Sequence, residues 1–392
     1  MLRCLNLPHT RSAESEGPPF CGGWIGFLTY DNRTALPAVK LNFFDAVLAY
    51  QHVEKRWWVG TVLLDETSPE KIASSLTYKV SKFLEHFAPD VSAYAAKIAE
   101  RKFIANFSKT TYCDAVRRAL NYISAGDVYQ LNLAQRFTVP WETGEKASAQ
   151  LFMRLREQSP AAFGVFMGHE LVGNDQAVCS ISPELFLRVR DRTVTTRPIK
   201  GTRARPVDAA ATAAAARELD ANPKERAELN MIIDVLRHDL GRVCEFGSVS
   251  VESAGTIEEL PTLLHRVATI SGRLRARCSA PRLLRAVFPG GSVTGAPKIR
   301  AMQIIDELEP DPRGLYCGAI GWLGVNGDLD LNIAIRTAIH DTQKGTVQYH
   351  AGSGIVADSD PESEYDETLQ KARAFFRATQ ATPADPGAAM MP

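Results

Sequence analysis

The stretch LVGNDQAVCSISPELFLRVRDRTVTTRPI, residues 171–199, indicates which kind of fold this chain adopts. Its apolar and β-branched residues are interrupted by Gly, Asn, Asp and Pro, a pattern typical of short strands joined by hairpins. The same pattern recurs at 22–31 (GGWIGFLTYD), 316–323 (YCGAIGWL) and 321–356. Within the last stretch we expect two strands, GDLDLNIAIRTAIHD and VQYHAGSGIV, separated by a turn.

Helices are expected between these runs of strands, where apolar residues recur at helical spacing. They cover residues 109–124, 146–157, 214–242, 298–307 and 361–379. The strands come in runs, without a regular βαβ alternation, which favours an α+β fold with large antiparallel sheets over a doubly wound parallel sheet. No linker rich in Pro and Gly interrupts the interior, so we expect one large domain.

Composition limits the class of protein. Lys plus Arg and Asp plus Glu both number 45 among 392 residues, and this zero net charge argues against a broad nucleic-acid-binding surface. The seven cysteines are scattered without a CxxC pair, which favours a reducing compartment over a disulfide framework or a structural zinc site. No apolar run approaches the length of a membrane span, and the N-terminus has no apolar signal core. We therefore expect a cytoplasmic protein that binds neither nucleic acid nor membrane.

The first candidate for chemistry is Lys200, in the stretch Arg197-Pro198-Ile199-Lys200-Gly201-Thr202-Arg203. A lysine after an apolar strand is commonly a surface charge at the strand end. Here, however, Gly201 permits a ligand to approach the backbone. Arg197 and Arg203 flank the lysine, and neighbouring positive charge favours the neutral amine, which is the nucleophilic form. Both interpretations remain open from this stretch alone.

The second candidate is Glu184, in Ser182-Pro183-Glu184-Leu185-Phe186, where one carboxylate stands in an otherwise apolar strand. Burial would raise the pKa of Glu184 and suit it to proton transfer. The alternative is an exposed acid beside a turn-forming proline.

Carboxylates on two predicted helices are candidate metal ligands. Glu228 lies at the edge of the apolar stripe of the helix 214–242, and Glu364, Glu367 and Lys371 lie along one side of the helix 361–379. Carboxylates that enter a core from two helices suit Mg²⁺, which takes one or two of them and completes its shell with water and substrate oxygens. Solvated helix faces with i,i+4 ion pairs are the alternative.

Two glycine-rich stretches are candidate anion-binding loops. FPGGSVTGAPK (288–298) fails the phosphate-loop pattern, but its small residues precede a helix whose N-terminal amides can hold an anion. Ala-Gly-Ser-Gly (351–354) is a second loop where backbone N–H groups can hold a carboxylate. Ordinary turn chemistry of glycine explains either stretch equally well.

Taken together, these segments resemble the chorismate-utilising enzymes, the family that includes anthranilate synthase component I, aminodeoxychorismate synthase component I and the isochorismate synthases. The resemblance runs from about residue 22 to 378 and rests on nine motifs in order. They are GGWIGFLTYD, GDVYQLNLAQRF, ISPELF, RPIKGTRAR, ERAELNMIIDVLRHDLGRV, FPGGSVTGAPKIRAMQIIDELEP, YCGAIGW, NIAIRTAI and AGSGIVADSDPESEYDETLQKA. It implies a two-lobed catalytic domain that binds chorismate over residues 22–380, between a flexible N-terminal segment (1–21) and a flexible C-terminal tail (381–392).

The resemblance also implies roles for individual residues. Lys200 matches the branch that makes 4-amino-4-deoxychorismate for p-aminobenzoate and folate, whereas anthranilate synthases carry Ala there. By resemblance Lys200 attacks C2 of chorismate and expels the C4 hydroxyl, and ammonia then adds at C4. Glu184 matches the general acid/base and His265 a further catalytic position. Glu228, Glu364 and Glu367 match the Mg²⁺ ligands. The positions that match chorismate binding are Gly201, Thr202, Ser292, Tyr316, Arg336, Gly352, Ser353, Gly354 and Lys371.

Ammonia is expected to come from a separate glutamine amidotransferase subunit. No cysteine lies in a G-x-C-x-G nucleophile elbow, and Tyr316-Cys317-Gly318 comes closest but lacks the first glycine. Three alternatives remain. Two lie within the family, an anthranilate synthase and an isochorismate synthase, and the third is a catalytically dead binding or regulatory paralogue.

Overall fold

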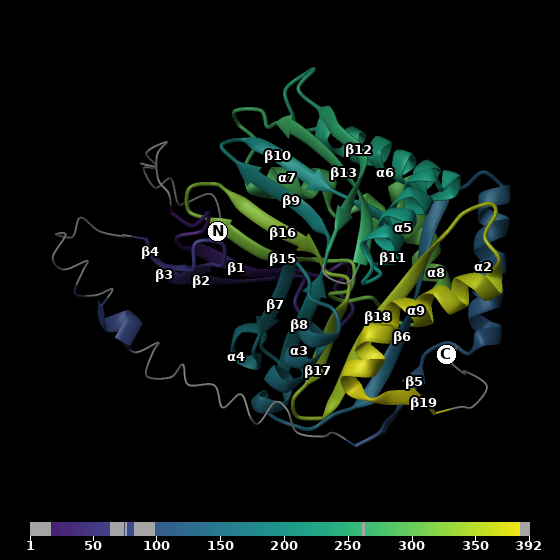
Figure 1. Ribbon diagram of the computed structural model, residues 1–392, viewed down its shortest axis with the longest axis horizontal. Coiled ribbons are helices and arrows are strands. Elements are labelled where there is room, and N and C mark those ends of the chain that lie inside the picture. The colour runs from purple at the N-terminus through teal and green to yellow at the C-terminus, as the bar shows by residue number, and fades with distance from the viewer. Residues whose placement is uncertain (1–16, 63–73, 75–76, 82–98, 261–262, 385–392) are drawn as a thin grey trace.

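The computed structural model describes residues 17–62, 74, 77–81, 99–260 and 263–384 (Figure 1). Most strands belong to two sheets, with neighbours that are antiparallel apart from the parallel pair β5–β19. The nine-stranded sheet comprises β1 (Gly23–Leu28), β2 (Val39–Phe44), β9 (Leu185–Arg190), β10 (Thr193–Arg197), β11 (Ile199–Ala204), β12 (Ser250–Glu259), β13 (Leu263–Arg273), β15 (Ala319–Gly324) and β16 (Leu329–Ile333). The eight-stranded sheet comprises β5 (Arg101–Ala105), β6 (Gln130–Pro140), β7 (Phe163–Met167), β8 (Gln176–Ser182), β14 (Gly295–Ala296), β17 (Thr337–Asp341), β18 (Thr346–Ile355) and β19 (Ala381–Pro383).

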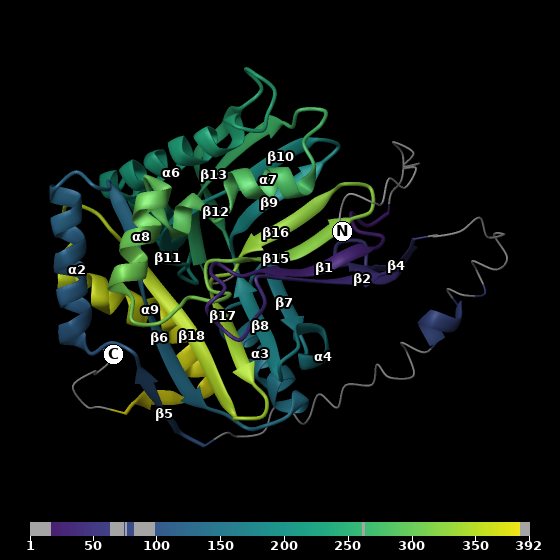
Figure 2. The same ribbon diagram turned by 180° about the vertical axis from the view of Figure 1, so that it is seen from behind.

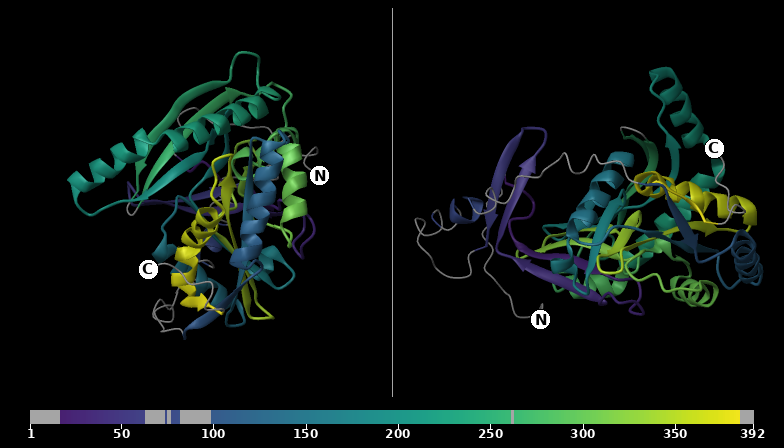
Figure 3. Two further views of the ribbon diagram at one scale, coloured as in Figure 1. Left: turned by 90° about the vertical axis from the view of Figure 1, so that its right-hand side faces the viewer. Right: turned by 90° about the horizontal axis from the view of Figure 1, so that it is seen from below.

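The strand orders place distant segments side by side. The nine-stranded sheet runs β11-β13-β10-β9-β16-β15-β1-β2 with β12 on β13, and the eight-stranded sheet runs β19-β5-β6-β18-β17-β8-β7 with β14 on β6. A separate hairpin of β3 (Ala46–Gln51) and β4 (Arg56–Thr61) projects to one side (Figure 3). These extensive antiparallel sheets confirm the α+β fold class expected from the sequence.

Helices cover the outer faces of the sheets, as the view from behind and the side views show (Figures 2 and 3). They are α2 (Lys109–Ser124), α3 (Glu145–Gln158), α4 (His169–Val172), α5 (Ala209–Ala221), α6 (Pro223–Gly241), α7 (Ala280–Val287), α8 (Lys298–Leu308), α9 (Pro361–Thr379) and the 3₁₀ helix η2 (Gly291–Val293). The apolar faces of α2, α3, α8 and α9 share one core with the eight-stranded sheet, and those of α6 and α7 share another with the nine-stranded sheet. A third, smaller core lies where the sheets meet, and it joins Phe27 and Ile320 of one sheet to Met167 and Val178 of the other.

The chain passes from one sheet to the other at two adjacent crossings. The link of residues 183–184 joins β8 to β9, and residues 334–336 join β16 to β17. Backbone hydrogen bonds tie the crossings together, because Ile333 N–H donates to Glu184 O at 3.1 Å and Ile181 N–H donates to Arg336 O at 3.0 Å. Polar residues at these crossings therefore meet at the junction of the two sheets.

Most helices lie where the sequence predicted them, but α5 and α6 were predicted as one helix. Predictions at 109–124 and 361–379 match α2 and α9, and those at 146–157 and 298–307 match α3 and α8 to within one residue at each end. The single helix predicted over 214–242 is wrong, because the chain breaks at Asn222 into α5 and α6. The Asn222 side chain accepts hydrogen bonds from the amides of Lys224 and Glu225, and Pro223 occupies the first turn of α6. Helix α7 was not expected.

The predicted ends can be compared with the structure only in part. Residues 1–16 and 385–392 lie outside the described residues, so their predicted flexibility stays a prediction. Within the predicted N-terminal segment Phe20 is buried, with its ring centroid 4.9 Å from that of Trp322. Within the predicted tail Ala381–Pro383 form β19, so regular structure continues past residue 380. No helix in the described parts of the chain has the length and apolar character needed to span a membrane.

Candidate active site

Glu184 occupies the crossing between β8 and β9, rather than the interior of a strand as the sequence suggested. The residue is 5% exposed. Burial raises the pKa of the Glu184 carboxyl to about 7, against the opposing effects of the Ser292 hydroxyl, the Lys200 ammonium and the Ile199 amide. Ser292 Oγ donates to Glu184 Oε1 at 2.7 Å. The carboxyl therefore exchanges its proton near neutral pH, as an acid/base group requires.

Lys200 extends from β11 into the same junction. Its Nζ lies 3.6 Å from Glu228 Oε2 on α6, with both side chains 17% exposed. An added Cβ at Gly354 would come within 3.3 Å of Lys200 Nζ, so the absence of a side chain at position 354 makes room for the amine. Lys200 thus pairs with Glu228 on α6, and its charge also acts on Glu184 at the crossing.

The expectation that flanking arginines act on Lys200 does not hold in this structure. Arg197 pairs with Glu258, and Arg203 Nη1 donates to Glu225 Oε1 at 2.9 Å. Each guanidinium is thus paired with a carboxylate of its own.

His265, Thr202 and Arg336 lie together on the β11 side of the junction. Thr202 Oγ1 and His265 Nδ1 are 2.9 Å apart, and His265 Nε2 is buried without a partner. Burial, helped by the nearby Arg336 charge, lowers the pKa of His265 to about 4, so the ring is neutral at physiological pH. Arg336 has a left-handed backbone (φ 51°) and forms no ion pair with a carboxylate of the described residues. Its guanidinium is available to an anionic ligand.

Helix α9 supplies the third side of the junction. Lys371 Nζ donates to Gly352 O at 2.9 Å and pairs with Glu367 Oε1 at 2.6 Å. Burial acts to raise the pKa of Glu367, but Lys371, together with the charges of Lys200 and Lys224, holds the pKa below its ordinary value. Glu364 is 4% exposed, and Ser359 Oγ donates to its Oε1 at 2.6 Å. Burial raises the pKa of Glu364, and repulsion from the Glu367 carboxylate raises it further.

Residues 351–354 lie within a strand, which confirms the strand expected over VQYHAGSGIV (347–356), whereas the loop considered at 351–354 is wrong. Residues 346–355 form β18 and pair with β6 along their whole length. Strand β17 pairs only with residues 346–349, so the other edge of β18 has no β17 partner from His350 onward. Gly352, Ser353 and Gly354 lie in that part of the strand, and Ser353 Oγ is 3.1 Å from the buried hydroxyl of Tyr112. The backbone groups that were predicted to be open to a ligand therefore belong to the edge of β18 that β17 does not cover.

Tyr316 lies against β18. Its ring stacks on His350 at 5.2 Å, and Arg313 lies 5.6 Å from the ring centroid. Burial raises the pKa of Tyr316, so the hydroxyl stays protonated. The structure therefore joins Ser292 to Glu184, Lys200 to Glu228 and Lys371 to Glu367. The charges of Lys200 and Lys371 both act on Glu184, which links the three pairs.

Two residues at the site were missed from the sequence. Gln130, in β6, is 2% exposed, its Oε1 has no hydrogen-bond partner, and its Nε2 lies 2.7 Å from the position of a Cβ at Gly354. Glu225 has a buried Oε2 without a partner, 2.4 Å from the position of a Cβ at Gly201 (φ 83°), which only glycine tolerates. Buried polar atoms without partners are rare in proteins and call for an explanation. Glu225 lies one helical turn before Glu228, so helical spacing could have indicated that it faces the same site. No sequence pattern indicated Gln130.

The carboxylates of α6 and α9 fit a cation only in part. In the described residues no three His, Cys, Asp or Glu side chains already form a metal site. Glu228 and Glu367 each face a lysine, and Glu364 accepts from Ser359. However, the unpartnered Glu225 Oε2 and the mutual repulsion of Glu364 and Glu367 are both relieved by positive charge. This donor set suits a hard cation that takes few protein carboxylates and completes its shell with water and substrate oxygens.

Comparison with known proteins defines the class. The family model described as chorismate binding enzyme matches residues 3–377, so the chain belongs to the chorismate-binding enzyme family, whose members act on chorismate. It is 38% identical to aminodeoxychorismate synthase component 1 of Klebsiella aerogenes over 90% of this chain and 76% of that protein. It is 37% identical to anthranilate synthase component 1 of Pseudomonas aeruginosa over 92% of this chain and 75% of that protein. The crystal structure of anthranilate synthase component I from Streptococcus pneumoniae is 32% identical and superimposes with a TM-score of 0.78, covering 93% of this chain and 82% of that one.

Proposed function

We propose that this enzyme aminates chorismate at C4 with ammonia in a Mg²⁺-dependent reaction and so makes 4-amino-4-deoxychorismate, on the route to p-aminobenzoate and folate. The observation that carries the proposal is the position of Lys200, whose amine lies 3.6 Å from Glu228 and beside the buried Glu184. The likeness to proteins named aminodeoxychorismate synthase component 1 supports it.

Chorismate carries two carboxylates, and the site offers a place for each. One binds Arg336, which has no acidic partner among the described residues, together with the open edge of β18. The other reaches the acidic side formed by α6 and α9, where Mg²⁺ held by Glu228, Glu364 and Glu367 would neutralise it and act as a Lewis acid. The ring then lies between these ends, beside Lys200 and Glu184.

Lys200 acts as a nucleophile in the proposed reaction. Its neutral amine forms a bond from Nζ to C2, the ring double bonds shift, and the C4–O bond breaks. Glu184, with a pKa of about 7, gives its proton to the leaving hydroxyl, so water departs. Ammonia then bonds to C4, the double bonds shift back, and the C2–Nζ bond breaks, which returns Lys200 to its starting form. The ammonium group formed at C4 gives a proton back to Glu184, so the acid is restored as well. The fixed amine supplies the nucleophile at high effective concentration.

Anthranilate formation is the second candidate, because relatives named anthranilate synthase component 1 are nearly as similar. That reaction places ammonia at C2, where the proposed lysine bond forms. The nature of residue 200 is what favours amination at C4.

The deciding experiment is product identification. The purified chain is incubated with chorismate and an ammonium salt, with and without Mg²⁺, and the products are separated and identified by mass spectrometry. We expect 4-amino-4-deoxychorismate, formed only with Mg²⁺. Anthranilate or isochorismate as the main product would overturn the assignment.

A further inference from the structure

The second half of the chain contains a long stretch without acidic residues. No Asp or Glu occurs from Leu260 to Ile305, although the whole chain has equal numbers of acidic and basic residues. This stretch contains eight Lys and Arg residues, and three of them have acidic partners: Arg266 with Asp220, Lys298 with Asp239 and Arg300 with Asp127. The remaining five are arginines, at 273, 275, 277, 282 and 285, and all five are exposed.

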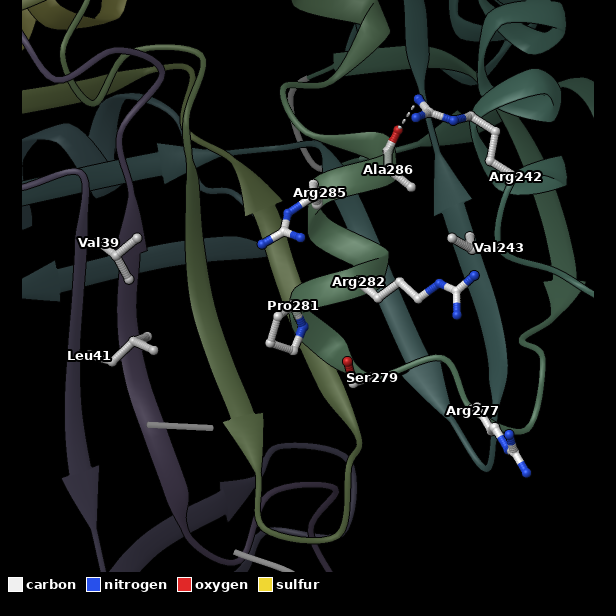
Figure 4. A pocket seen from close by; sticks show the side chains of 10 residues that line it. All are labelled: Val39, Leu41, Arg242, Val243, Arg277, Ser279, Pro281, Arg282, Arg285 and Ala286. Carbon is white, nitrogen blue, oxygen red and sulfur yellow. Dashed lines mark hydrogen bonds between the residues drawn. The ribbon is translucent and has the colours of Figure 1, made fainter. Parts of the chain in front are cut away.

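These arginines form no ion pair with a carboxylate in the described part of the chain. Three of them, Arg277, Arg282 and Arg285, line one open groove of about 1110 Å³ together with Arg242, the C-cap residue of α6 (Figure 4). Arg282 and Arg285 leave the same face of α7 and their side chains diverge in this view, and Arg242 Nη1 donates to Ala286 O at 3.0 Å. We call this surface the arginine groove.

The rest of the lining of the arginine groove is apolar except for Ser279. Val39 and Leu41 of β2 form the wall opposite α7, and Val39 is 53% exposed. Arginine beside apolar surface is typical of protein–protein interfaces, where arginine is enriched and lysine depleted. A nucleic-acid surface would instead need a broader excess of positive charge than this neutral chain carries. The groove therefore suits an acidic, partly apolar surface of another protein.

The helices that form the arginine groove are connected in sequence to residues of the candidate active site. Helix α7 ends at Val287, and the segment that follows contains Ser292, which donates to Glu184. Helix α6, which ends at Gly241 just before Arg242, contains Glu228, which faces Lys200. A protein docked on the groove would thus contact both elements that lead into the site.

We propose that the arginine groove docks the glutamine amidotransferase subunit that supplies ammonia, through an acidic surface of that subunit. The inference rests on the proposed function, which requires ammonia from a second protein. The relatives' names, which contain "component 1", agree with a second component. Opposite charge on the two surfaces would speed their association and set their orientation.

Charge reversal at the groove tests the proposal. The double variant Arg282→Glu/Arg285→Glu is mixed with the purified amidotransferase subunit of aminodeoxychorismate synthase from the same source, and Kd is measured at several salt concentrations. We expect Kd to rise at least about tenfold, since like charges then face each other across the interface. Glutamine-dependent turnover should fall at limiting partner, whereas ammonium-dependent turnover should stay unchanged.

The matched control is Arg156→Glu/Arg373→Glu, with the same change in charge on α3 and α9, and its Kd should stay at the wild-type value. Thermal unfolding checks that both variants fold. An unchanged Kd in the groove variant, or an equal loss in the control, would overturn the docking proposal, as would tighter binding of duplex DNA than of the amidotransferase. If the wild-type chain makes no 4-amino-4-deoxychorismate with ammonium, the proposed function fails, and Kd alone still decides the docking.

Discussion

Replacement of Glu184 by glutamine measures how much the buried carboxyl costs the fold when it ionises. Burial raises the pKa of Glu184 to about 7, from an ordinary value of 4.5. At 1.36 kcal/mol for each unit of pKa, this difference corresponds to roughly 3 kcal/mol. The folded protein holds the proton more tightly than the unfolded chain does. Stability from the protonated carboxyl is therefore fully present below pH 4.5 and is lost as the pH rises through about 7.

The side chain of the Glu184→Gln variant cannot ionise, so the variant should escape this loss while its amide oxygen still accepts from Ser292. Urea unfolding at pH 4.5 and pH 8 gives the free energy of unfolding for both proteins. We expect the variant to gain about 3 kcal/mol relative to wild type between these two pH values. Glu252→Gln, at an exposed position on β12, is the control and should show no such gain. A wild-type-to-variant difference that stays constant with pH would refute the burial argument.

Other substitutions test other parts of the site. Lys200→Ala should lower the rate by orders of magnitude and abolish any chorismate adduct on the enzyme, so a wild-type rate and product would contradict a nucleophilic lysine. Glu228→Ala or Glu367→Ala should abolish turnover while circular dichroism stays unchanged, and activity that survives EDTA would remove Mg²⁺ from the proposal. The pure chain should use ammonium salts but not glutamine, and glutamine-dependent activity without a partner would count against a separate amidotransferase. Asn222→Ala should lower the free energy of unfolding by about 1 kcal/mol through loss of the α6 cap, and an unchanged urea midpoint would show that the cap is dispensable.

Local patterns in the sequence were sufficient for several elements. The bounds of α2 and α9 could be predicted because apolar periodicity is a local signal. In the structure the N-caps Ser108 and Asp360, which also act within a few positions, define the starts of these helices. The break between α5 and α6 also has a local signal, Asn222-Pro223. It was not predicted because the apolar stripe of the helix expected over 214–242 was given more weight. The resemblance to the family rests on motifs spread along most of the chain, and the fold class was correct for the same reason.

Tertiary structure decided which of these groups meet. The sequence left open whether Glu184 was buried or exposed, because burial depends on a crossing between two sheets that is assembled from distant strands. Its partner Ser292 lies 108 positions away, and the arginines expected to influence Lys200 turned instead to acids on β12 and α6. Composition and periodicity therefore determined the elements and the class of protein. The pKa of Glu184 and the neighbours of Lys200 arose only when the sheets were joined, since desolvation and charge act through space and not along the chain.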